Sequence, residues 1–274
     1  MLLRGVAELA ERYDDFLVDL WGVIHDGEAP YPGAVDALER LAQTEGKRVL
    51  FVTNTSRAGA AVITTLDTLG IGRHLFFDVV SSGDVTRAAL AARDPVVFGA
   101  LPSPPRCLHY GDDGFVPWLF ELHLPMVDDV DACDLVVASG APHDTSTLAR
   151  VSKHLAAAAA RGVPLVCTNP DRVIPKGEST TLGPGAVAAA YRDLGGRVFL
   201  YGKPHAPIYE EARRRLASSS AAPGRMVAIG DLVETDIAGA RGAGIPSVLV
   251  TRGRSGVVES AEITPEMVIE RFRW

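Results

Sequence analysis

Cysteine is scarce in this sequence, and its three copies, Cys107, Cys133 and Cys167, lie far apart. Their number is odd, and no CxxC pair or cluster of cysteine and histidine accompanies them. A disulfide framework and a zinc site are therefore not indicated. We expect all three to be buried thiols of a hydrophobic core.

Long apolar runs and an excess of basic residues are also missing. No stretch reaches the ~18 uninterrupted apolar residues of a membrane span, and the opening "MLLRGVAELAERYDDF" has acidic residues but no cleavage site. The 27 Lys and Arg are outnumbered by 34 Asp and Glu, which gives a net charge of −7 and argues against binding to a phosphate backbone. We expect a soluble, cytoplasmic protein with neither nucleic acid nor membrane as partner.

Apolar residues are plentiful, and they recur in short runs. The chain has 274 residues, of which 47% are hydrophobic, enough for a large core and two lobes. Runs bounded by Gly, Asn and Asp are typical of strands buried on both faces of a parallel sheet. They are "FLVDLW", "RVLFVTN", "FFDVVSS", "PVVFGA", "DLVVASG", "PLVCTN", "RVFLYGK", "MVAIGD" and "SVLVTRG". The pattern predicts an α/β protein.

Helical patterns separate these runs. Residues 33–46 place Val35, Leu38, Leu41 and Ala42 on one stripe, and Gly46 is a suitable C-terminal stop. Residues 146–162 show a similar pattern and also end in glycine. We expect both helices to be scaffold.

Polar side chains follow several of the predicted strands, and they carry the functional information, because ligands bind beyond the carboxyl ends of parallel strands. These residues are Asp19, Thr53, Asn54, Lys203 and Asp231, with Asp236 about one helical turn after Asp231. The stretch from 84 to 177 has strands but no such set, and we interpret it as an inserted second lobe.

The order of these residues resembles the haloacid dehalogenase superfamily, and within it the class IIA, NagD-like phosphatases. Asp19 in "VDLWGVIHDG", Thr53 in "FVTNTS", Lys203 in "YGKPHAPIY" and Asp231 with Asp236 in "GDLVETDIAGARGAG" match its four motifs in sequence. The resemblance implies a Rossmann-like parallel-sheet core, formed by residues 1–83 and 178–274. It also implies an inserted α/β cap of the C2 type at 84–177.

The resemblance further implies hydrolysis of a small-molecule phosphate ester through an aspartyl-phosphate, with Mg²⁺ as cofactor. Asp19 would be the nucleophile, while Thr53, Asn54 and Lys203 would bind the phosphoryl group. The metal ligands would be Asp19, the backbone carbonyl of Trp21, Asp231 and Asp236. A homodimer is left open.

Trp21 is a departure from the family pattern, because it occupies the position of the aspartate that usually transfers protons. An indole N–H cannot do general acid or base work. Three alternatives follow: a slow or selective phosphatase in which His25, a cap residue or solvent supplies protons, a different reaction such as dehalogenation, or a non-catalytic binder of a phosphorylated metabolite.

Candidate substrate contacts in the cap are the polar residues at its own strand ends. They are His109, Asp112, His143, Asn169 and Asp171. The sequence "NPD" at 169–171 is also a common turn, so Asn169 and Asp171 have a structural alternative. Sugar phosphates, nucleotides and pyridoxal phosphate all stay open as substrates.

Overall fold

The computed structural model describes residues 1–111, 116–140, 144–176, 179–218, 224–253 and 263–274. The chain forms two compact units. The first unit consists of Met1–Thr53, Arg57–Ser81 and Lys203–Trp274, and the second of Asn54–Ser56 and Ser82–Gly202. The second unit thus extends to residue 202, whereas the sequence placed its end at 177. The difference arises because the last strand before residue 202 pairs with the second unit's sheet.

The first unit is built on a six-stranded sheet in the order β12-β11-β10-β1-β2-β3, with every pairing parallel. Its strands are β1 (Asp15–Val18), β2 (Arg48–Thr53), β3 (Asp78–Ser81), β10 (Met226–Gly230), β11 (Ser247–Val250) and β12 (Met267–Ile269). The central strand β1 pairs with β2 on one side and β10 on the other. The carboxyl ends of these three strands therefore meet at one edge of the sheet.

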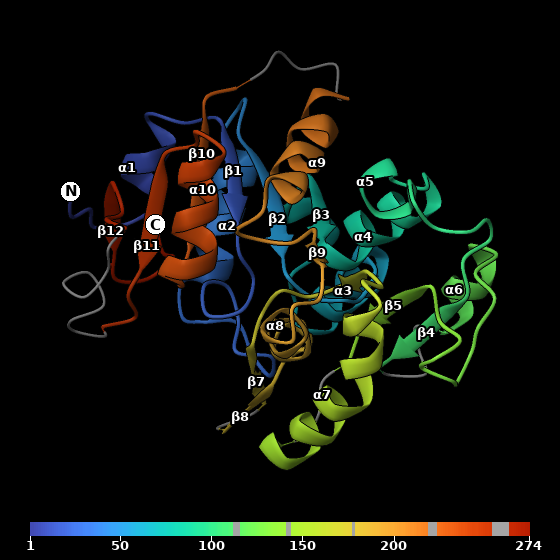
Figure 1. Ribbon diagram of the computed structural model, residues 1–274. Coiled ribbons are helices and arrows are strands. Elements are labelled where there is room, and N and C mark those ends of the chain that lie inside the picture. The colour runs from blue at the N-terminus through green and yellow to red at the C-terminus, as the bar shows by residue number, and fades with distance from the viewer. Residues whose placement is uncertain (112–115, 141–143, 177–178, 219–223, 254–262) are drawn as a thin grey trace. The chain divides into compact units, whose positions relative to one another are not determined.

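Helices cover both faces of this sheet, with α9 and α10 on one face and α2 on the other (Figure 1). The helical elements of the first unit are α1 (Ala7–Ala10), α2 (Ala34–Gln43), α3 (Gly59–Thr68), the 3-10 turn η1 (Arg73–Leu75), α9 (Ala206–Ala217), the π-helix η3 (Val233–Ile237) and α10 (Ala238–Gly242). Side chains of a strand alternate between faces. Accordingly, Phe16 and Val18 join the core that contains Leu38 of α2, while Leu17 points to the face where Tyr209 of α9 lies.

The second unit has its own parallel sheet, in the order β4-β5-β6-β9, and a separate hairpin of β7 and β8. Its strands are β4 (Cys107–Tyr110), β5 (Leu135–Ala138), β6 (Leu165–Cys167), β7 (Val173–Lys176), β8 (Ser179–Leu182) and β9 (Val198–Leu200). Its helices are α4 (Ser82–Ala91), α5 (Pro95–Phe98), α6 (Val116–Glu121), α7 (Thr145–Ala160) and α8 (Pro184–Asp193). The two sheets confirm the predicted α/β class with an inserted cap.

Both predicted helices are present. The pattern at 33–46 forms α2, and Gly46 adopts a positive φ of 76° just beyond it, as the predicted stop requires. The pattern at 146–162 forms α7, which Asp144 caps by accepting a hydrogen bond from the Thr147 amide at 2.7 Å. Ala42 was wrongly placed on the buried stripe, because it is exposed and Ala34 and Ala37 are buried instead.

Two of the predicted strands differ from the structure. The run "PVVFGA" forms the short helix α5, because Pro95 suits the first turn and Asp94 caps it through the Val96 amide at 2.9 Å. The run "RVFLYGK" does form a strand, β9, but this strand pairs with β6 of the second unit instead of the main sheet. Lys203 therefore does not follow a strand of the first unit.

The three cysteines are free and buried, which confirms the prediction that they are core thiols. Cys133 and Cys167 belong to the core of the second unit. Among the described helices, none combines the length and apolar character needed to cross a membrane.

Candidate active site

The loop that follows β1 carries Asp19 into the centre of the site. Its amide donates a hydrogen bond to the Ile229 carbonyl at 2.9 Å, which continues the pairing of β1 with β10. Three residues later the chain turns at Gly22, where φ is +78°. A Cβ at Gly22 would lie 2.2 Å from Oδ2 of Asp231, so only glycine allows this loop to approach the Asp231 carboxylate.

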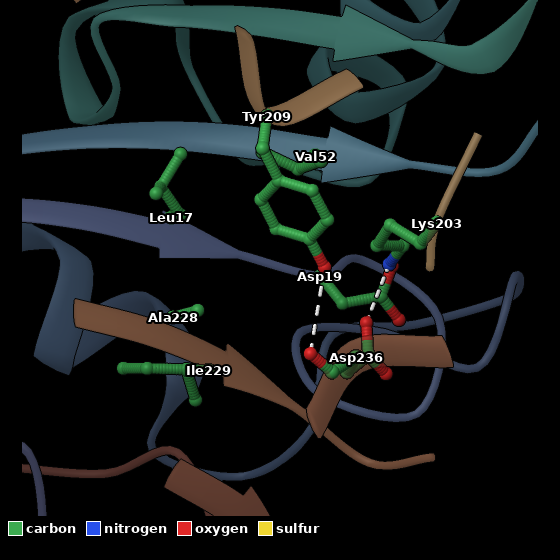
Figure 2. Close-up of a pocket in the computed structure, with 8 residues that line it drawn as sticks. All are labelled: Leu17, Asp19, Val52, Lys203, Tyr209, Ala228, Ile229 and Asp236. Carbon is green, nitrogen blue, oxygen red and sulfur yellow. Dashed lines mark hydrogen bonds and ion pairs between the residues drawn. The ribbon is translucent and has the colours of Figure 1, made fainter. Parts of the chain in front are cut away.

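Lys203 is the buried cation of the site, with 4% of its surface exposed. Its Nζ donates to Oδ1 of Asp19 and to Oδ1 of Asp236, each at 2.6 Å. Figure 2 shows the three side chains pointing toward one another. Burial disfavours the ammonium form, but the two carboxylates outweigh it, so the pKa of Lys203 lies above its usual value. Lys203 stays charged at neutral pH.

Asp236 anchors the lysine from the π-helix η3, a type of turn often found at functional sites. Its second oxygen, Oδ2, accepts hydrogen bonds from the amides of Asp231 and Leu232 at 3.2 and 3.1 Å. Gly230 makes this close packing possible, because a Cβ there would lie 2.1 Å from the Asp236 side chain. Both Asp236 oxygens thus have protein partners, so this side chain holds Lys203 and the loop after β10 in place.

Asp19, Asp231 and Asp236 form a cluster in which one carboxylate oxygen from each residue lies within 4.8 Å of the other two. Burial raises the pKa of Asp19 to about 8, and the charges of Asp236 and Asp231 add to this effect while Lys203 opposes it. Hard oxygen ligands of this kind suit Mg²⁺. The cluster can therefore hold a divalent cation, which would also favour the ionised form of Asp19.

Tyr209 packs against this polar cluster and was not found from the sequence. Its hydroxyl donates to the Asp236 backbone carbonyl at 3.4 Å, and its ring lies beside Asp19 (Figure 2). A cavity of about 10 Å³ remains between these groups and the sheet, hardly enough for one water molecule. On the side that faces the sheet, Lys203 and the carboxylates are therefore tightly packed. Tyr209 lies within a helix and follows no strand, so the strand-end rule could not select it.

Arg252 was also missed, although it contacts the cluster directly. Its Nη2 donates to Oδ2 of Asp231 at 3.0 Å, and its Nη1 donates to the Tyr31 hydroxyl at 2.7 Å. Arg252 follows β11, so the rule that selected Asp231 could have selected this arginine as well.

Trp21 and His25 pack against each other in the loop after Asp19, with ring centroids 5.6 Å apart in an edge-to-face arrangement. The indole also covers Gly27, where a Cβ would lie 2.4 Å from the ring. The Nδ1 atom of His25 accepts a hydrogen bond from the Gly27 amide at 3.0 Å, and burial lowers the pKa of this histidine. His25 is therefore a neutral side chain that holds the loop, which argues against it as the proton donor.

Thr53 lies at the end of β2, next to β1, and is buried with 5% exposed surface. Its position beside the Asp19 strand agrees with the predicted phosphate contact, although that role stays a prediction.

The predicted substrate contacts Asn54, Asn169 and Asp171 meet within the second unit. The Asn54 amide donates to Oδ1 of Asp171 at 2.7 Å, and the backbone amide of Asp171 donates to Oδ1 of Asn169 at 2.8 Å. The second bond is the turn that the sequence "NPD" favours. Binding of substrate by these residues stays a prediction.

Among the other predicted cap contacts, His109 contacts Ser139 through Nε2 at 2.7 Å. Asp112 and His143 lie outside the described residues.

A buried lysine, three carboxylates and a threonine lie near the ends of β1, β2 and β10, and this arrangement is typical of an α/β enzyme with an acidic site. Family comparison agrees with this class. The model for haloacid dehalogenase-like hydrolases matches residues 16–124, and the model described as HAD-hydrolase-like matches residues 200–274. The chain belongs to the haloacid dehalogenase superfamily, in its NagD- and chronophin-like branch of phosphatases.

Relatives cover nearly the whole chain. Chronophin from Homo sapiens is 31% identical over 94% of this chain and 88% of its own length. A haloacid dehalogenase-like hydrolase from Brucella suis 1330 superimposes with a TM-score of 0.84 at 30% identity, covering 98% of this chain and 99% of that one. Glycerol phosphate phosphatase from Mycobacterium tuberculosis, solved in complex with magnesium, gives a TM-score of 0.70 at 29% identity, covering 97% and 77% of the respective chains.

Proposed function

We propose that this protein is a Mg²⁺-dependent phosphatase that hydrolyses a small phosphorylated metabolite with Asp19 as the nucleophile. The observation that carries the proposal is the contact of one buried ammonium group with both Asp19 and Asp236, at 2.6 Å each, beside the carboxylate of Asp231. The relatives support it, since the similar glycerol phosphate phosphatase was solved in complex with magnesium.

Asp19, Asp231 and the backbone carbonyl of Trp21 would hold the Mg²⁺ ion, with Asp236 completing or orienting the set. The donor chemistry fits, because these groups are all hard oxygen ligands and three of them already converge. When bound, the ion would neutralise negative charge on the phosphoryl group and on Asp19. Because burial raises the pKa of Asp19, a bound cation would favour the ionised carboxylate that attacks phosphorus.

In the first step, a carboxylate oxygen of Asp19 would attack phosphorus, and the bond from phosphorus to the ester oxygen would break. The electron pair leaves with the ester oxygen, which takes up a proton from solvent to become the alcohol product. Water would then attack the aspartyl-phosphate, release inorganic phosphate and restore the Asp19 carboxylate. Lys203 would stabilise negative charge on the phosphoryl oxygens throughout, and Thr53 would donate a hydrogen bond to one of them.

We propose that Trp21 takes the position of the proton-transferring aspartate of the family motif, and that this site works without that aspartate. General acid and base catalysis contributes typically ~10²–10⁴-fold to a rate. The neutral, hydrogen-bonded state of His25 offers no replacement inside the loop. Esters whose leaving groups need no protonation should therefore be the better substrates.

The test is phosphate release from p-nitrophenyl phosphate and from a panel of sugar phosphates, nucleotides, glycerol phosphate and pyridoxal phosphate, with Mg²⁺ and with EDTA. Activity should require Mg²⁺ and should disappear in Asp19→Asn. Asp36→Asn is a matched control, because Asp36 is an exposed carboxylate on α2 that pairs with Arg40.

Two results would contradict the proposal. Unchanged turnover in Asp19→Asn would exclude Asp19 as the nucleophile. No turnover of any ester, together with tight binding of a phosphorylated metabolite, would favour the non-catalytic binder, for which the indole at position 21 is the supporting observation.

A further inference from the structure

Arg252 is held against the candidate metal site by contacts on three sides. Its Nη2 donates to Oδ2 of Asp231 at 3.0 Å, and Nη1 donates to the Tyr31 hydroxyl at 2.7 Å. Its guanidinium carbon lies 5.4 Å from the centre of the Tyr31 ring, a cation–π distance. The backbone amide of Arg252 donates to the Glu270 carbonyl at 2.7 Å. The arginine is thus fixed at both its backbone and its charged end.

The backbone conformation at this position is unusual for arginine. Arg252 has a φ of +52°, in the left-handed region that normally favours glycine. Residues are held in such conformations mostly where the surrounding structure requires them. A glycine would suit this turn without strain, so the reason for an arginine lies in what its side chain contacts.

The contacted carboxylate is the one that would bind a metal ion. Asp231 is buried, with 6% of its surface exposed, and it belongs to the cluster with Asp19 and Asp236. Any cation bound to Asp231 shares that carboxylate with the guanidinium, and like charges so close together repel strongly in a partly buried site.

The guanidinium also has space to withdraw. Arg252 and Tyr31 line a cavity of about 230 Å³ in the first unit, together with Val23, Val250, Arg271 and Phe272. In its observed position Arg252 uses its donors incompletely, because Nε is buried with no partner among the described residues. The position on Asp231 is therefore held by charge attraction and by Tyr31, and a competing cation could displace it.

We propose that Arg252 is a built-in cation that competes with a divalent metal ion for Asp231, and thereby lowers the affinity of this site for Mg²⁺. The inference rests on the proposed function, because it assumes that Asp231 is a metal ligand. Without a bound metal, Arg252 balances the charge of a buried carboxylate. With Mg²⁺ bound, the guanidinium must tolerate the ion or move into the cavity.

Calorimetric titration of the EDTA-stripped protein with Mg²⁺ tests this competition. Arg252→Gln removes the charge, and it should bind Mg²⁺ at least tenfold more tightly than the parent. Arg252→Lys keeps the charge and should stay within about threefold of the parent. Tyr31→Phe loosens Arg252 while keeping the ring, so it should tighten Mg²⁺ binding by an intermediate factor. Arg225→Gln is the matched control, since Arg225 pairs with Asp14 ahead of β10, away from the cluster.

Thermal unfolding gives an independent readout. In EDTA, Arg252→Gln should melt below the parent, because Asp231 loses its counter-charge. Saturating Mg²⁺ should raise the melting temperature of this variant by more than that of the parent.

The outcomes separate the two proposals. If the parent binds Mg²⁺ and Arg252→Gln binds it equally well or more weakly, the competition is refuted while the proposed function stands. If neither protein binds Mg²⁺, both the competition and the metal assignment fail. Should Arg252→Gln not fold, Tyr31→Phe decides, because unchanged or weaker binding in that variant also refutes the competition.

Discussion

Without metal, the stability of this protein should fall as the pH rises from about 5 to about 8, because of Asp19. Burial and the neighbouring carboxylates raise the pKa of Asp19 from 3.8 in the unfolded chain to about 8 in the folded protein. Between these values the folded protein holds a proton that the unfolded chain has lost. Raising the pH through this window removes that proton and therefore destabilises the fold.

The expected size of the effect is large compared with the stability of a typical domain. One pKa unit corresponds to 1.36 kcal/mol, so between pH 5 and pH 8 the free energy of unfolding should fall by a few kcal/mol, at most on the order of 4 kcal/mol. Whole domains are stable by only about 5–15 kcal/mol. Saturating Mg²⁺ should remove most of the slope, because a bound cation favours the ionised carboxylate.

The assay is urea unfolding in EDTA, followed by tryptophan fluorescence at several pH values between 5 and 8. Asp19→Asn lacks the titrating group, so its stability should vary little and should exceed that of the parent at pH 8. His25 acts in the opposite sense, because its pKa is lowered in the folded protein, but it is present in both proteins and cancels in the comparison. Asp36→Asn should keep the parental slope. The reasoning is refuted if Asp19→Asn follows the parental slope, so that the difference in stability between the two proteins does not change with pH.

Three further substitutions probe separate parts of the site and its scaffold. Gly22→Ala should abolish Mg²⁺ binding and activity, because its Cβ would meet the Asp231 carboxylate at 2.2 Å and its φ of +78° disfavours alanine. A normal Mg²⁺ affinity in calorimetric titration would disprove this. Trp21→Asp should raise kcat/KM for an alkyl phosphate by up to ~10²–10⁴-fold and change p-nitrophenyl phosphate less. Equal parental rates on the two esters would mean that another acid already acts. Arg48→Met should lower the free energy of unfolding by about 3–5 kcal/mol, because fully buried Asp15 loses its partner at 2.6 Å. Arg48→Met should leave kcat unchanged. A variant that is as stable to urea as the parent would contradict this prediction.

The sequence predicted the centre of the candidate site because each central residue lies near a strand end or in a motif of fixed order. Asp19, Asp231 and Asp236 do converge, and Lys203 contacts two of them. The sequence predicted less well how the fold brings Lys203 to these carboxylates. Lys203 follows β9, which belongs to the second unit's sheet, and local sequence does not reveal which sheet a short apolar run will join.

What the sequence could not reveal depends on contacts between distant segments. Arg252 meets Asp231 across 21 positions and Tyr31 across 221, and nothing in the local pattern of either residue indicates these pairs. The helix α5 was mistaken for a strand because "PVVF" is short and apolar, and length could not distinguish the two. Asp94, whose side chain caps the helix, and Pro95 in its first turn were the overlooked local signals.

The pairing of β1 has a consequence for how the chain folds during synthesis. Its neighbour β2 is close in sequence, but the register on its other side joins Asp15 to Met226. At a synthesis rate of about 5–20 residues per second, that partner emerges roughly 10–40 s later. During this interval one edge of a fully buried strand, with Phe16, Leu17 and Val18 on it, has no partner in the sheet. The nascent chain should therefore depend on chaperone protection until β10 has been made, and pausing of the ribosome before residue 226 should increase aggregation.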